Sequence, residues 1–316
     1  IGWAAGTRWG NPYRATVFKT TNGGKVWINQ IDELVFDMVC VYFINELIGW
    51  SVNSSVGSVW LTTDGGDNWT SYSVVPSENV KLLFNASLFF IDASTGWYTS
   101  QGWIRKSTDG GNTWINKSST GGLSVFFIDQ NNGWVAGDNG ILKSTDGGES
   151  WVVKSSLTAS YVRFYDSNIG MCVGGGSVLV SMDGGENWTT KSGPSLQTIN
   201  FINQSIVLGY TSEGTLYKTT NLGNTWETLN TGLGFGETAF FINEYTGWVG
   251  GLDGTMFKYS NEPMIAITSP KGGEVWKSGW QRNITWTSEN ISNVNLYYST
   301  NGGVTFIEDK VNSVFF

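Results

Sequence analysis

Aspartates recur at one place in an eight-residue box that the chain repeats six times, and they are the first candidates for chemistry. Carboxylates repeated in this way look like ligands, but each one precedes a glycine pair or its equivalent. Asn and Asp before Gly-Gly are also turn-formers, because glycine tolerates positive φ and the short side chain bonds nearby backbone N–H groups. Six copies spread along a chain serve a repeated unit rather than one site, so we predict structural turns and no metal site. The residues are Asn22, Asp64, Asp109, Asp146, Asp183 and Asn221.

Arginine and aromatic side chains gather in two segments outside the boxes. Together they can stack on sugars, peptides or pigments, so we take them as candidate ligand-binding residues. An ordinary long loop is the alternative interpretation of the first segment. The candidates are Arg8, Trp9, Tyr13 and Arg14 in the first segment, and Trp103 and Arg105 in the second.

Three acidic residues offer a different chemistry. An inverting glycosidase needs only a pair of carboxyl groups several ångströms apart, and Asp138, Glu213 or Asp253 could supply one. Each follows a glycine-rich turn, which favours the interpretation as turn-formers. Asp32 and Glu33 belong to an acidic run that we interpret as a solvated face.

The composition excludes several kinds of site. There is no histidine, which removes the usual general base, the usual zinc ligand and every Ser-His or Cys-His nucleophile. Cys40 and Cys172 lie in apolar runs, and we interpret them as buried small hydrophobes too far apart for a disulfide. A net charge of −8 argues against nucleic acid as a partner, and no segment is long and apolar enough to span a membrane. We predict no cofactor.

The elements that position these residues follow from the repeat. Each box ends in a tryptophan, at intervals of 37 to 45 residues: Trp27, Trp69, Trp114, Trp151, Trp188 and Trp226. The clearest unit divides into four strand-like pieces, which we name A (125–129), B (133–137), C (140–145) and D (from Trp151). Four short strands per forty residues make the blade of a β-propeller, so the fold class is all-β. The box tryptophan is predicted to be a buried apolar plug between strands or blades.

Counting the pieces predicts 26 strands. The Gly-Trp type of B strand occurs six times, and a degraded seventh copy lies at Ile206–Tyr210. We count seven B strands and seven C strands, but only six A strands and six D strands. This count predicts a seven-bladed ring that lacks one A strand and one D strand, with a six-bladed ring as the alternative. Arg163 lies in an A strand and could face the central channel.

The box with its flanks, FxD…GWxxG…GxIxxTxDGGxxW, resembles the Asp-box or bacterial neuraminidase repeat. That repeat is known from sialidases, sortilin-type receptors, xyloglucan-cleaving hydrolases and the photosystem II stability/assembly factor family, and the fuller unit is most similar to the last group and its secreted bacterial relatives. The resemblance covers residues 1–259 and implies a propeller. Because these families differ in activity, it implies little about function. A sialidase site would need three convergent arginines, and we do not expect such a triad from the four in the propeller, Arg8, Arg14, Arg105 and Arg163. The same four are too few and too scattered for the arginine-rich patch expected of an assembly factor of the photosystem II type.

After the propeller come a linker at 260–263 and a segment at 264–316 that resembles an immunoglobulin-like β-sandwich module of secreted bacterial proteins and that we expect to be incomplete in length. Unpaired strand edges predict self-association. The function that we infer is a non-catalytic binding or scaffolding propeller, secreted or on a bacterial cell surface, with a protein or glycan ligand. A carbohydrate-active hydrolase is the first alternative, and an assembly factor of the photosystem II type is the second.

Overall fold

A computed structural model describes the chain in two compact units, Ile1–Tyr259 and Ser260–Phe316. Every regular element among the described residues is a β-strand. The described residues are 1–8, 14–33, 38–53, 57–74, 86–230, 236–251, 255–271, 273–275, 277, 282–291, 294–299, 301 and 304–309.

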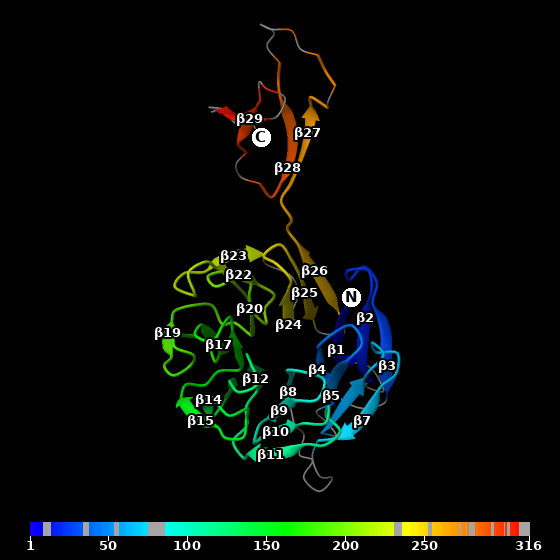
Figure 1. The fold of residues 1–316 in the computed structure, drawn as a ribbon, viewed down its shortest axis with the longest axis vertical. Helices are drawn as coiled ribbons and strands as arrows, with labels where there is room; N and C mark the ends of the chain where they lie inside the picture. The colour runs from blue at the N-terminus through cyan, green and yellow to red at the C-terminus, as the bar shows by residue number, and fades with distance from the viewer. Residues whose placement is uncertain are drawn as a thin grey trace. The chain divides into compact units, whose positions relative to one another are not determined.

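The first unit is a ring of seven antiparallel sheets in its described residues (Figure 1). Each sheet is one blade, and we number the blades in chain order. Blade 1 contains β1 (Gly2–Arg8), β2 (Arg14–Thr20) and β3 (Ile28–Glu33). Blade 2 contains β4 (Met38–Phe43), β5 (Gly49–Asn53), β6 (Ser58–Thr62) and β7 (Thr70–Ser73). Blade 3 contains β8 (Ser87–Phe90), β9 (Gly96–Ser100), β10 (Trp103–Ser107) and β11 (Ile115–Ser118).

The remaining blades follow the same order. Blade 4 contains β12 (Ser124–Phe127), β13 (Gly133–Gly137), β14 (Gly140–Ser144) and β15 (Val152–Ser155). Blade 5 contains β16 (Tyr161–Phe164), β17 (Gly170–Gly174), β18 (Ser177–Ser181) and β19 (Thr189–Lys191). Blade 6 contains β20 (Thr198–Phe201), β21 (Val207–Tyr210), β22 (Leu216–Thr219) and β23 (Glu227–Asn230). Blade 7 contains β24 (Gly236–Phe241), β25 (Thr246–Gly251) and β26 (Met256–Ser260).

The prediction of a seven-bladed all-β ring is confirmed, and the six-bladed alternative is wrong. The degraded B strand is β21. In the described part of the chain, blade 1 consists of B, C and D strands, and blade 7 consists of A, B and C strands. These are the two incomplete sheets that the strand count predicts.

The box folds through side-chain hydrogen bonds to its own backbone. In blade 4, Ser144 Oγ accepts the Gly148 N–H at 2.7 Å, and Asp146 Oδ1 accepts the Ser150 N–H at 3.0 Å. Gly147 and Gly148 have φ of 73° and 81°, a left-handed conformation that favours glycine. The Gly147 N–H also donates to Asn131 O, which ties the box to the turn between β12 and β13. The box is therefore a closed turn that holds the strands of one blade in register.

Aromatic stacking joins neighbouring blades from blade 1 to blade 5. The B-strand tryptophan Trp97 of blade 3 stacks on the A-strand Phe127 of blade 4, with ring centroids 3.5 Å apart, and Trp151 meets the same Phe127 edge-on at 5.8 Å. The indole N–H of Trp97 donates to Gly147 O at 3.0 Å. The same three-ring arrangement recurs at Trp3–Phe43–Trp69, Trp50–Phe90–Trp114 and Trp134–Phe164–Trp188.

The structure corrects the prediction that the box tryptophans are the buried plugs. All six are only partly buried, and the four that belong to a stack meet its phenylalanine edge-on. Three tryptophans of the B strands are the buried ones: Trp50, Trp97 and Trp134 are at most 1% exposed. Their stacks and their hydrogen bonds to the next box hold neighbouring blades together.

The second unit consists of two separate antiparallel pairs among its described residues. One pair is β27 (Met264–Ser269) with β28 (Thr285–Glu289), and the other is β29 (Leu296–Tyr298) with β30 (Ile307–Asp309). The immunoglobulin-like sandwich stays a prediction.

Candidate functional site on the inner strands

The A strands lie nearest the centre of the ring (Figure 1). Each A strand of blades 2 to 7 has a phenylalanine at the position that stacks on tryptophan in blades 2 to 5. The residue before this phenylalanine points to the opposite face of the sheet, because side chains alternate along a strand. This position lies opposite the second residue of the B strand in the ladder. Its occupants are Tyr42, Phe89, Phe126, Arg163, Asn200 and Phe240.

Four of these side chains form a continuous surface, which we call the inner crescent: Tyr42, Phe89, Phe126 and Arg163. The rings of Tyr42 and Phe89 lie 5.3 Å apart, and those of Phe89 and Phe126 lie 5.4 Å apart. Arg163 Cζ lies 5.6 Å from the centre of the Phe126 ring. All four side chains are partly exposed, and the three rings also pack against buried residues of the cores.

Arg163 ends the crescent with a positive charge. Its guanidinium lies 4.1 Å from the Tyr161 ring centre, and its Nη1 donates to Val162 O at 2.7 Å. Within the described ranges no carboxylate forms an ion pair with it. A guanidinium held by aromatic faces and one carbonyl keeps donors for an anionic or carbonyl group of a ligand.

Tyr42 closes the other end of the crescent. Burial raises the pKa of its hydroxyl above the usual value, and the charge of Arg163 opposes that shift. Tyr42 is therefore a neutral hydrogen-bonding group near pH 7. Cys40 lies two residues earlier on β4, and burial raises the pKa of its thiol to about 12, so it is not a nucleophile at neutral pH.

Arg105, one of the predicted ligand-binding residues, is held by the protein itself. Its Nη1 donates to Val74 O, its guanidinium lies 5.4 Å from the Trp103 ring centre, and burial lowers its pKa. Trp9 and Tyr13 lie outside the described residues. Arg8 and Arg14 are backbone partners at the ends of β1 and β2, and their side chains also fall outside the description.

The predicted acidic pair does not assemble where the structure describes its members. Asp138 is exposed and accepts a 3.4 Å hydrogen bond from Gln101, while Glu213 is exposed in the next blade but one. Asp253 lies outside the described residues, as do the side chains of Asp32 and Glu33. Among the residues described, no three His, Cys, Asp or Glu side chains cluster as metal ligands would.

The box aspartates are engaged in their own turns. The pKa of Asp64 is lowered to about 2 by hydrogen bonds from the Asn68 side chain and backbone, and then from Thr62. The pKa values of Asp146 and Asp183 are also about 2, with Ser150 and Asn187 as the main donors. Such ionised, fully engaged carboxylates are poor candidates for acid catalysis, which needs a raised pKa.

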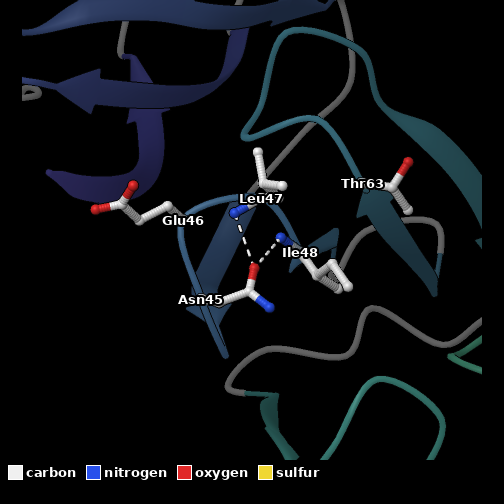
Figure 2. Close-up of a pocket in the computed structure, with 5 residues that line it drawn as sticks. All are labelled: Asn45, Glu46, Leu47, Ile48 and Thr63. Carbon is white, nitrogen blue, oxygen red and sulfur yellow. Dashed lines mark hydrogen bonds between the residues drawn. The ribbon is translucent and has the colours of Figure 1, made fainter.

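A shallow pocket lies beside the turn between β4 and β5, lined by Asn45, Glu46, Leu47, Ile48 and Thr63. Figure 2 shows the Asn45 side chain turned back onto the Leu47 and Ile48 nitrogens, both 2.8 Å from its Oδ1. The same turn recurs at Asp129 in blade 4, so it belongs to the repeated unit. With one carboxylate and mostly aliphatic lining, the pocket has no convergent chemistry.

The inner crescent was the feature that sequence reasoning missed, apart from Arg163. Its signal is a departure from the repeat: the position is aromatic in Tyr42, Phe89 and Phe126, and becomes polar at Arg163 and Asn200.

Comparison with known proteins places the fold among Asp-box propellers. The family model described as photosynthesis system II assembly factor YCF48 matches residues 118–236, which span β12 to β23. No curated protein sequence matches the chain. In the described residues there is no helix that could cross a membrane.

Solved structures agree on the fold. YCF48 from Cyanidioschyzon merolae is 16% identical with a TM-score of 0.58, over 82% of this chain and 99% of that one. An ancestral GH74 enzyme is 15% identical with a TM-score of 0.57, over 90% of this chain and 44% of that one. The extracellular domain of the one-component system BT4673 from B. thetaiotaomicron is 15% identical with a TM-score of 0.59, over 84% and 43%. Because identities this low show the fold alone, the function must come from the site.

Proposed function

We propose that this chain is a non-catalytic propeller that binds an extended segment of a protein partner on its inner crescent. The observation that carries the proposal is the row of three partly exposed aromatic rings that ends at Arg163, which has no carboxylate partner in the described residues. Aromatic rings supply contact area at low entropic cost, and the guanidinium supplies donors that orient a carbonyl or carboxylate group.

A scaffold of the assembly-factor kind is the form of this function that the comparisons support. The family model matches the blades that contain Phe126 and Arg163. YCF48 itself is described as a photosystem assembly factor, and a likeness at 16% identity carries no partner across to this chain. We therefore propose the class of partner, an extended polypeptide, and leave its identity to experiment.

We also propose that the protein acts outside the cell. Charged residues make up 14% of the chain, and neutral polar residues and glycine are abundant, a surface composition that suits extracellular proteins. Protease shaving of intact cells that express the natural gene tests this location. Protection of the protein until the cells are lysed would contradict it.

The binding test is a library of random dodecapeptides displayed with free and with amidated C-termini. We expect enrichment of peptides with aromatic residues and an acidic group, with affinities reduced at least tenfold by Arg163→Gln. Lys25→Gln is the matched control, because it removes one charge at an exposed position of the blade 1 box. Equal losses in the two variants, or enrichment only on a glycan array, would contradict a peptide site on the crescent.

The absence of catalysis is tested on sialosides and on β-glucan and xyloglucan oligosaccharides. We expect no turnover, since the two described candidates for a carboxylate pair, Asp138 and Glu213, are both exposed and lie in different blades. Hydrolysis that disappears in Asp138→Asn, Glu213→Gln or Asp253→Asn would favour the glycosidase instead.

A further inference from the structure

The inner wall of the ring changes its chemistry between blades 5 and 6. Ser124 Oγ of blade 4 accepts the Val162 N–H of blade 5 at 3.3 Å, and the same type of bond joins the A strands one blade earlier. Tyr161 holds the corresponding position in β16, three residues before the phenylalanine, and its ring supports Arg163 instead. The serine bond between A strands is therefore not repeated from blade 5 to blade 6.

Asn200 follows Arg163 at the same position of the next A strand, and two carbonyl groups fix the orientation of its amide. The Asn200 Nδ2 donates to Phe241 O of blade 7 at 3.1 Å and to Phe201 O at 3.3 Å. Only the nitrogen of the amide can donate to carbonyl oxygens, so Oδ1 lies on the other side. In the described part of the chain no donor bonds to this oxygen. Because Asn200 is partly exposed, its Oδ1 is an acceptor that a ligand can use.

This acceptor and the donors of Arg163 belong to neighbouring strands. The strands β16 and β20 lie against each other, and the rings of Tyr165 and Phe201, at or just beyond the ends of these strands, have centroids 6.1 Å apart. The Arg163 guanidinium lies over the Tyr161 ring, and among the described contacts it makes no hydrogen bond with Asn200. The polar end of the inner wall therefore presents a donor group and a separate acceptor side by side.

An extended polypeptide has the groups that match such a pair. In an extended chain each residue turns its N–H and its C=O to the same edge, so one residue can donate and accept on one side. A carboxylate or another simple anion matches only Arg163, since it brings no donor for the Asn200 oxygen. A proline residue also lacks the N–H. An acceptor beside a guanidinium thus favours a ligand group that both donates and accepts.

We propose that Asn200 is a specificity-determining residue of this site, and that its Oδ1 accepts a backbone N–H of the bound segment beside the group that Arg163 holds. This inference rests on the proposed function, the binding of an extended polypeptide on the inner crescent. It limits the ligand class to segments that have a free backbone N–H at that residue, and it excludes proline there. The binding surface thereby extends from blade 5 to blade 6.

The test uses N-methylation, which removes one backbone donor at a time. The probe is the tightest dodecapeptide from the displayed library, synthesised again with each backbone N–H in turn replaced by N-methyl and titrated into the full 316-residue chain. We expect one analogue that binds the unaltered chain at least fivefold more weakly than the parent peptide, and less than twofold more weakly in Asn200→Ala. Enriched peptides should lack proline at the position that this analogue marks.

Three further variants separate recognition from a structural role. Asn224→Ala is the matched control, because it removes an exposed asparagine from the box of the same blade and should leave the N-methyl effect unchanged. Asn200→Asp keeps an acceptor oxygen and should keep the effect, although it loses the donor to Phe241 O. Asn200→Leu replaces Asn200→Ala if the smaller side chain does not support folding. A variant that only loosened the wall would weaken the binding of all analogues by the same factor.

The proposal is overturned if no N-methyl effect depends on Asn200, if Asn224→Ala removes the effect as well, or if the folded Asn200→Asp variant loses it. Failure of the proposed function has a different result. In that case no dodecapeptide binds, or Arg163→Gln and Lys25→Gln reduce affinity equally, and the role of Asn200 is rejected with it. Peptide binding that depends on Arg163 but shows no coupling to Asn200 contradicts this inference alone.

Discussion

The interface between blades 4 and 5 and the interface between blades 7 and 1 start from the same residue types. Trp134 in β13 lies against a glycine of the next box, as Trp248 in β25 does, but Trp134 stacks on Phe164 and donates to Gly184 O at 3.1 Å. Trp248 stacks on no ring within the described part of the propeller, and its N–H is unpaired. This difference indicates that blades are joined by the complete stack of B-strand tryptophan, A-strand phenylalanine and box tryptophan, and not by the B-strand tryptophan alone.

The largest expected effect separates these two tryptophans. Trp134→Ala removes a fully buried stacked ring and should lower the free energy of unfolding by roughly 3–5 kcal/mol. Trp248→Ala should cost about 1–2 kcal/mol, because the ring is only partly buried and its N–H makes no hydrogen bond. Urea unfolding followed by circular dichroism measures both. Equal losses would mean that the two interfaces are energetically alike in spite of their geometry.

A pair of glycine substitutions sharpens the comparison. Gly133→Ala would bring a Cβ within 2.4 Å of the Phe127 ring, which is held between Trp97 and Trp151, so we expect a loss of roughly 1–3 kcal/mol from overpacking. Gly2→Ala meets only Thr20 and Trp27, and should change stability by less than about 0.5 kcal/mol. Thermal midpoints of the two variants decide this. A destabilised Gly2→Ala variant would indicate that Gly2 is as tightly packed as Gly133.

The box tryptophans should respond less than the B-strand tryptophans. Trp151→Ala removes a partly buried ring that meets Phe127 edge-on, and should cost roughly 1–2 kcal/mol. Trp27→Ala, in the box of blade 1, should cost less because no central ring packs against Trp27 in the described residues. Denaturant midpoints for the pair, measured beside Trp134→Ala, test the order. A loss at Trp151 as large as that at Trp134 would return the role of core plug to the box.

The sequence predicted the ring and its strands because turn chemistry and strand alternation are local. The Gly-Trp pairs located the B strands, and the weak copy at Ile206–Tyr210 was found as β21 because the period required a strand there. The burial order of the tryptophans could not be predicted in this way. A period fixes which residues recur, but the twist of each sheet decides which face meets the next blade.

The inner crescent shows the same limit. Tyr42, Phe89 and Phe126 belong to apolar runs in which neighbouring residues look interchangeable. Only the register opposite the B strand separates the ring over glycine from the ring on the other face of the sheet. Arg163 was visible as a candidate because a charge in an A strand breaks the pattern. The candidate Arg105 was misleading, because it lies in β10 and the sequence does not show that its guanidinium is already bound to a carbonyl of its own protein.

The smallest expected effect concerns the boxes at which these two interfaces end. Blade 5 has an aspartate there, Asp183, whose pKa is about 2 because the Asn187 side chain and backbone donate to it. Blade 1 has Asn22, whose Oδ1 accepts the Val26 N–H at 3.0 Å without any charge. A carboxyl with a pKa below its usual value stabilises the folded state above that usual value, near pH 4, and the contribution is lost as the pH falls toward 2.

We therefore expect the urea midpoint of Asp183→Asn to fall less steeply between pH 4 and pH 2 than that of the unaltered chain, with a small difference at pH 7. The asparagine boxes indicate that an amide can close the turn, since Asn221 Oδ1 accepts the Thr225 N–H at 2.9 Å. Asn22→Asp is the converse variant and should add acid sensitivity to the interface between blades 7 and 1. Parallel midpoint curves for all three proteins would show that the box carboxylates do not couple folding to pH, whatever their hydrogen bonds.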